Sequence, residues 1–185
     1  MAFTNFDTKE INCKIFYFGP PYCGKTTNLR VIYKKTSLEF QSGLMRFEET
    51  TYPTRFFDFL PLSLGQIKDY HVKLHLYTLP TNSLYKHVNS VLLKGIDGFV
   101  FVVDSAFDAL NENIKYLNYV KNILIDEGVN FLELPKVFQY NKRDLPDAIP
   151  VPILRQTLNT YGTHDNEAIA SQGIGSMETL QKIAK

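Results

Sequence analysis

The sequence contains few cysteines, and neither sign of charge predominates. Its two cysteines, Cys13 and Cys23, have none of the spacings of a metal-ligand or redox motif, which favours reduced thiols in a cytosolic protein. Its 20 lysine and arginine residues exceed its 19 aspartate and glutamate residues by one, so the formal net charge is +1. This balance gives no reason to expect a surface for nucleic acid or for an anionic membrane.

Long apolar runs are also missing. No stretch approaches the roughly 20 consecutive apolar residues of a membrane-spanning helix. The first residues lack the basic and then apolar layout of a secretory signal. There is neither a glycine at position 2 nor a C-terminal prenylation motif. We therefore expect a cytoplasmic protein with no direct membrane anchor.

The composition is that of a globular domain. Apolar residues make up 44% and charged residues 21% of the 185 residues, which argues against a disordered or low-complexity chain. A chain of this length can bury one substantial core, and no repeat, linker or break in composition divides it. We therefore expect one domain spanning residues 1–185.

Short apolar runs alternate with helical patterns along the chain. The runs that predict strands are 13–18, 55–62, 72–78, 98–105, 135–140 and 166–171. The patterns that predict helices are 25–36, about 109–126 closed by Gly128, 152–161 with a proline in its first turn, and 176–184.

Three of these runs have features that the others lack. The strands 55–62 and 72–78 are joined by a turn containing Gly65, Gln66 and Asp69, which predicts an antiparallel hairpin. The run 98–105 is apolar on both pleat faces, as in a central strand covered by helices on either side. The predicted fold is therefore α/β, a three-layer sandwich with a mostly parallel sheet of six or seven strands, an antiparallel edge strand and helices on both faces.

The strongest local motif is GPPYCGKT, residues 19–26, which matches G-x-x-x-x-G-K-[ST]. A predicted strand precedes it and a predicted helix follows it. In such a loop, backbone N–H groups surround phosphate oxygens, and the N-terminal end of the following helix points toward them. Lys25 would then neutralise the β and γ phosphates, and the Thr26 hydroxyl would ligate Mg²⁺.

A second motif, NKRD, occupies residues 141–144 directly after the predicted strand 135–140. Ligands of open parallel sheets bind at the carboxyl ends of the strands, so this loop and the first motif would face one crevice. Asp144 could accept hydrogen bonds from the N1–H and 2-amino groups of guanine, which adenine does not offer in that arrangement. NKRD alone is a common surface sequence, but after a P-loop it indicates a guanine-nucleotide site.

The two motifs together resemble the signature of Ras-like small GTPases. The segments EINCKIFYFGP, FFDFLPLSLG, KGIDGFVFVVDS and VFQYNKRDLP are similar to the bacterial MglA family of gliding-motility and cell-polarity GTPases. The resemblance implies a Ras-like fold, GTP and GDP as ligands, and Mg²⁺ as cofactor. It also implies an MglB-like roadblock activator and a RomR-like polarity protein as partners, which would recruit the protein to a cell pole.

The resemblance also assigns residues to the nucleotide site. Thr54 matches the switch I threonine that senses Mg²⁺ and the γ-phosphate, and Thr78 stands where most small GTPases have aspartate. Ala170 and Ser171 match a loop whose backbone contacts the guanine oxygen, although small residues before a glycine also occur in ordinary turns. Thr26 and Thr54 are the expected metal ligands. The expected nucleotide-binding residues are Gly19, Pro20, Pro21, Tyr22, Cys23, Gly24, Lys25, Thr26, Thr27, Thr54, Thr78, Asn141, Lys142, Asp144, Ala170 and Ser171.

The chain departs from the family where GTP is hydrolysed. MglA-type sequences usually read T-x-P-G-Q at the end of the strand 72–78, starting at the position of Thr78, and the glutamine orients the attacking water. Here Thr81 replaces the glycine and Asn82 replaces the glutamine. Asparagine is one methylene shorter, and a shift of about 1 Å in a catalytic group can lower the rate roughly a hundredfold.

Two further departures concern groups near the γ-phosphate. The family usually carries an arginine immediately before the switch I threonine, but this chain has Pro53 there, and Arg55 follows two residues later. Arg55 could approach the phosphate if this segment slides along the strand; the alternative is a solvated edge-strand arginine. Pro21 stands where glycine is frequent, and it offers no N–H.

These departures weaken hydrolysis, whereas the binding residues remain. We therefore expect a monomeric GTP-binding switch with slow or activator-dependent hydrolysis, in which Asn82, Thr81 and Arg55 occupy the catalytic positions. One alternative is a scaffold that stays bound to GTP and docks polarity proteins. Another is a different P-loop enzyme, such as a kinase, which the NKRD motif disfavours.

Overall fold

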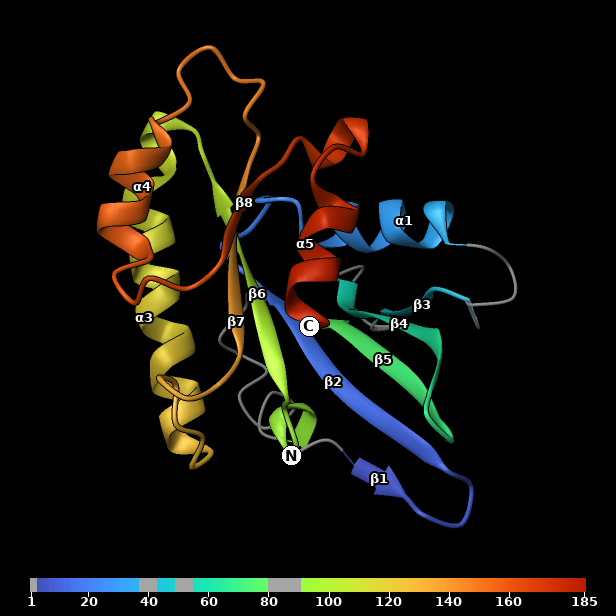
Figure 1. Cartoon of the computed structure of the whole chain (residues 1–185). Coiled ribbons are helices and arrows are strands. Elements are labelled where there is room, and N and C mark those ends of the chain that lie inside the picture. The colour runs from blue at the N-terminus through green and yellow to red at the C-terminus, as the bar shows by residue number, and fades with distance from the viewer. Residues whose placement is uncertain (1–2, 37–42, 49–54, 80–90) are drawn as a thin grey trace.

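The computed structural model describes residues 3–36, 43–48, 55–79 and 91–185. Its strands form one sheet, with α1 and α5 on one face and α3 and α4 on the other (Figure 1). The strands are β1 (Phe3–Asn5), β2 (Glu10–Phe18), β3 (Met45–Glu48), β4 (Arg55–Ile67), β5 (Tyr70–Thr78), β6 (Gly98–Asp104), β7 (Lys136–Asn141) and β8 (Asp165–Glu167). The helices are α1 (Lys25–Lys35), α3 (Leu110–Asp126), α4 (Val151–Leu158) and α5 (Ser176–Ile183), with 3-10 turns η3 (Phe107–Ala109) and η4 (Ala170–Gln172).

The predicted three-layer α/β fold is confirmed. The sheet order is β3-β4-β5-β2-β6-β7-β8. The strands β5, β2, β6, β7 and β8 are parallel to their neighbours in this series, whereas β3 and β4 add an antiparallel edge. This seven-strand path agrees with the predicted size of the sheet, and β1 adds an eighth strand antiparallel to one end of β2.

The core lies on both faces of the sheet because strand side chains alternate between them. Along β2, Phe16 and Phe18 enter the cluster that contains α3 and α4 residues, whereas Ile15 and Tyr17 enter the cluster that contains α1 and α5 residues. All seven residues of β6 are buried, as predicted for a central strand. A continuous apolar run therefore indicated a strand with helices on both sides.

The hairpin of β4 and β5 forms as predicted, but its turn was placed too early. Gly65 and Gln66 lie within β4, where they pair with β5, and Lys68 and Asp69 make the turn. The register shifts between Ser63 and Gly65, which marks an irregularity in the ladder. Glycine in a strand often marks such a bulge rather than the end of the strand.

Other boundaries also differ from the sequence prediction. The α4 helix ends at Leu158 rather than at residue 161, because the Asn159 side chain accepts from the Thr163 N–H and donates to its carbonyl, which closes a turn. The last strand ends at Glu167, and Ala170 lies in η4. Strands β1 and β3 were not predicted, since three or four residues are too few to show an alternating pattern.

The parallel strands place several loops at one edge of the sheet. Asp104 of β6 is paired with Asn141 of β7, so both strands end at the same level. The loop that begins at Gly19 follows β2, the next strand of the sheet. The predicted phosphate and base motifs therefore emerge at the same edge, where parallel α/β sheets bind their ligands.

None of the helices in the described part of the chain combines the length and the apolar character needed to cross a membrane.

Candidate functional site

The loop between β2 and α1, residues 19–24, requires glycine at both of its ends. Gly19 has φ 143° and Gly24 has φ 107°, values that residues with side chains rarely adopt. A Cβ atom on Gly19 would lie 2.2 Å from the Val102 carbonyl oxygen, and one on Gly24 would lie 2.2 Å from Asn141 Nδ2. The glycines thus allow this loop to lie directly against β6 and against the NKRD loop.

Lys25 begins α1 and its amino group is enclosed by the loop. Its Nζ donates hydrogen bonds to the carbonyl oxygens of Gly19 at 2.8 Å and Pro20 at 2.7 Å. The Cys23 thiol is buried behind the loop, and this burial raises its pKa, so it packs as a neutral group. The arrangement places a cation inside a loop of backbone groups, as a phosphate-binding loop requires.

A cavity of about 270 Å³ opens at this loop. Among the described residues, those that line it are Tyr22, Gly24, Lys25, Thr26, Thr27 and Arg30. All of these except Arg30 were predicted from the sequence. Pro21 and Tyr22 are exposed at the outer side of the loop.

Asp58 of β4 is a site residue that the sequence prediction missed. Its carboxylate is fully buried and its Oδ2 accepts a hydrogen bond of 2.5 Å from the Thr26 hydroxyl. Thr78 of β5 also contacts it: the Asp58 N–H donates to Thr78 Oγ1 at 2.9 Å, and that hydroxyl donates to Asp58 Oδ2 at 3.3 Å. One carboxylate therefore joins α1, β4 and β5 beside the cavity.

The sequence contained a signal for Asp58. It is an acidic residue between phenylalanines in an otherwise apolar strand, and a carboxylate is rarely buried there without partners. Oxygen ligands such as carboxylates and hydroxyls suit Mg²⁺. Thr26 and Asp58 thus provide a donor set that fits this ion.

Asn141, the first residue of NKRD, joins three loops. Its Nδ2 donates to the Cys23 carbonyl at 2.7 Å, and its Oδ1 accepts from the Ala170 N–H at 2.9 Å. Its backbone carbonyl accepts from the Ser105 N–H at 3.1 Å. The side chain is buried, with 3% of the residue exposed. One amide thus fixes the P-loop and η4 relative to the end of β7.

The rest of NKRD continues along the same edge of the sheet. Lys142 has a positive φ of 62°, and its Nζ contacts Asp104 Oδ2 at 2.5 Å. Asp144 is exposed. Ala170 is buried, whereas Ser171 is exposed in η4. The structure therefore brings the P-loop, NKRD and η4 together, as the resemblance implied.

Four of the predicted residues are not placed by this geometry. Thr54, Thr81 and Asn82 lie outside the described residues. Arg55 is the first residue of β4, but its side chain is also outside the description. Their assigned roles stay predictions.

Comparison with known proteins identifies a relative over the whole chain. No family model matches. Among curated proteins, the chain is similar to the "Mutual gliding-motility protein MglA" of Myxococcus xanthus (strain DK1622), with 44% identity over 185 residues. The match covers 100% of this chain and 95% of the relative. Identity of this extent, together with the P-loop between β2 and α1, shows that the chain belongs to the MglA family and has a Ras-like fold.

Proposed function

We propose that the protein is a GTP-binding molecular switch of the MglA type that hydrolyses GTP slowly on its own. The observation that carries the proposal is the Asn141 side chain, which binds both the P-loop carbonyl of Cys23 and the backbone of Ala170. This amide holds a phosphate-binding loop and a base-reading loop in one fixed arrangement. Such an arrangement suits a ligand that has phosphates at one end and a base at the other.

Guanine selectivity follows from Asp144. Its exposed carboxylate follows Asn141, the last residue of β7, by three residues. A carboxylate there accepts two hydrogen bonds from guanine and none of the same kind from adenine. Sites that pair such groups reject the wrong base by large factors, because its binding leaves polar groups unpaired.

Mg²⁺ would be held by Thr26 and Asp58, with Thr54 as a further ligand. The Thr26 hydroxyl and the buried Asp58 carboxylate are already within hydrogen-bonding distance. When bound, the ion neutralises charge on the β and γ phosphates. Most small GTPases have an aspartate at the position of Thr78, and here Asp58 would supply the acidic group instead. The Thr78 hydroxyl orients the Asp58 carboxylate.

Slow hydrolysis follows from the sequence of the catalytic positions. Asn82 is too short to orient water as glutamine does, Thr81 restricts the backbone, and Pro53 offers no cationic group. The GTP-bound form would then persist until an MglB-like roadblock activator promotes hydrolysis. In that form the protein would bind a RomR-like polarity protein and control motility and cell polarity. This role agrees with the name of the relative, a gliding-motility protein.

Three measurements test this function. The nucleotide that co-purifies with the protein should be GTP, and GTP should bind far better than ATP. In a single-turnover assay with excess protein, hydrolysis should be slow and should accelerate with the activator. An adenine nucleotide in the site, or fast unassisted hydrolysis, would contradict the proposal.

A switch must also bind its partners differently in its two states. Partner affinity should therefore be measured with GDP and with a non-hydrolysable GTP analogue. Equal affinities would show that nothing is switched and would favour the scaffold alternative.

A further inference from the structure

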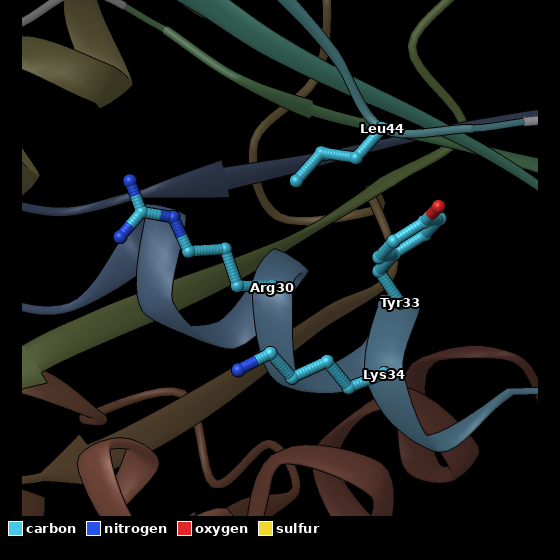
Figure 2. A pocket seen from close by; sticks show the side chains of 4 residues that line it. All are labelled: Arg30, Tyr33, Lys34 and Leu44. Carbon is cyan, nitrogen blue, oxygen red and sulfur yellow. The ribbon is translucent and has the colours of Figure 1, made fainter.

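Two neighbouring cavities share one cationic residue. Arg30 lines the phosphate cavity of about 270 Å³ together with Gly24, Lys25, Thr26 and others. It also lines a second cavity of about 610 Å³, whose other described lining residues are Tyr33, Lys34 and Leu44 (Figure 2). Arg30 therefore lies at the boundary between the phosphate cavity and the second cavity.

The helix geometry explains why Arg30 reaches the phosphate cavity and Lys34 does not. Arg30 follows Thr26 by four residues and Thr27 by three, so all three lie on neighbouring positions of one helix face. Side chains of a helix lean toward its N-terminus. Figure 2 shows the Arg30 side chain extending away from Tyr33, toward the N-terminal end of α1. Lys34 lies one turn further from that end.

We propose that Arg30 is a second phosphate-binding cation of the nucleotide site, beside Lys25; this rests on the proposed binding of GTP. Lys25 reaches into the loop from its inner side, where it contacts Gly19 and Pro20. Arg30 reaches the same cavity from the body of α1. A guanidinium offers several N–H donors in a planar fork that matches phosphate oxygens, whereas an ammonium acts as a point charge.

The body of α1 positions Arg30 in the site. It belongs to α1, whose Leu29 and Ile32 are fully buried against the sheet. The helix therefore holds Arg30 at a fixed place relative to Thr26.

The test compares Arg30→Gln with Lys34→Gln in the full-length protein, with GTP affinity measured by titration in the presence of Mg²⁺. Both variants remove one positive charge from α1 and keep a good helix-forming residue. Arg30→Gln should weaken GTP binding by roughly 10- to 100-fold, the range expected for a lost hydrogen bond to a charged group. Lys34→Gln should change it by less than about twofold, as for an exposed surface charge.

Thermal unfolding without nucleotide separates a loss of contact from a loss of structure. Arg30→Gln should remain folded and unfold in one cooperative transition, as the wild-type protein does. If that variant does not fold, Arg30→Met allows the same comparison, because it keeps an unbranched stem and removes the charge. Arg30→Lys keeps the charge without the fork and should recover part of the affinity; a lysine variant that binds no better than the glutamine variant would contradict the proposal.

The outcomes also separate this proposal from the proposed function. Wild-type protein that binds neither GTP nor GDP would overturn both. If the wild-type protein and Arg30→Gln bind GTP with the same affinity, the role of Arg30 is overturned but the proposed function is not. Equal losses in Arg30→Gln and Lys34→Gln would also overturn it, because they would reflect the net charge of α1 rather than a contact.

Discussion

The two halves of the proposed nucleotide site are held together by different chemistry. In the base half, which comprises Cys23, Asn141 and Ala170, a neutral amide binds two backbone groups. In the metal half, which comprises Thr26, Asp58 and Thr78, a carboxylate accepts from two hydroxyls. The partners of the Asn141 amide are main-chain groups, so the fold fixes their positions. The partners of the Asp58 carboxylate are side-chain hydroxyls, and these oxygens can bind a cation in place of the hydrogen bond.

The comparison suggests a division of labour within the site. The base half forms part of the folded scaffold, so damage to it should lower stability and binding together. The metal half should respond chiefly to Mg²⁺ and nucleotide, so damage to it should change ligand binding more than folding. The predictions below separate the two, from the largest expected effect to the smallest.

Gly24→Ala should have the largest effect, because it forces Asn141 away from the P-loop. Its Cβ atom would lie 2.2 Å from Asn141 Nδ2 at a φ of 107°. We expect the free energy of unfolding to fall by about 3 kcal/mol or more, and nucleotide binding to be lost. Denaturant unfolding and GTP titration measure both. Gly65→Ala is the control: its φ is 87° with nothing within 4 Å of the added carbon, so only the backbone strain of about 1–2 kcal/mol should remain.

Asn141→Ala should lower stability and GTP affinity together. It leaves the Cys23 carbonyl and the Ala170 N–H without their side-chain partner, and an unsatisfied buried group costs about 1–3 kcal/mol. We therefore expect a loss of roughly 2–4 kcal/mol in the free energy of unfolding. Asn118→Ala, at an exposed position of α3, should change little. Normal stability with weakened binding would show that the base half is not part of the scaffold.

Asp58→Asn should alter the response to Mg²⁺. Residues around a metal typically change its affinity by about 10- to 100-fold when substituted. We expect the Mg²⁺ concentration needed for tight GTP binding to rise by a factor within this range, and GTP binding to change little when a chelator is present. Asp126→Asn, at the exposed end of α3, is the matched control. An unchanged Mg²⁺ titration would remove Asp58 from the metal half.

Arg155→Gln should have the smallest effect, since it alters a contact outside both halves. The Arg155 guanidinium binds Asp165 with two hydrogen bonds, and these lower the pKa of the Asp165 carboxyl. A carboxyl whose pKa is lowered in the folded state stabilises the protein above its ordinary pKa of roughly 3.9, and this stabilisation is lost as the pH falls through the lowered value. The variant should therefore be slightly less stable than wild type at pH near 7 and equal to it in strong acid. A difference that persists in acid would show that the pair is not its cause.

The sequence predicted the parts of the fold that are marked by a run of apolar residues or by a motif. The short β-branched and aromatic run 13–18 and the continuous apolar run 98–105 identified β2 and β6, and Gly19, Gly24 and Lys25 identified the loop and the start of α1. Strands of three or four residues, such as β1 and β3, carry too little repetition to be recognised. The bulge near Gly65 was read as a turn, because glycine serves both purposes.

The site was predictable where a motif fixes the spacing and not where tertiary contacts create it. The residues of GPPYCGKT and NKRD lie next to each other in the structure because both follow parallel strands. Asp58 and Arg30 belong to no motif, and they reach the site only through strand pairing and helix orientation. An acidic residue in an apolar strand could have indicated the first, and the spacing of Arg30 four residues after Thr26 in the predicted helix 25–36 could have indicated the second.

The hydrogen bond between Asn141 and Cys23 connects residues separated by 118 positions. During synthesis the P-loop therefore leaves the ribosome long before its partner exists. A nascent chain that ends before β7 contains the whole phosphate motif but lacks Asn141, whose amide joins that motif to Ala170. The ability to bind nucleotide tightly should thus arise late in synthesis, once most of the sheet has been made, and bound GTP would mark chains that have completed it.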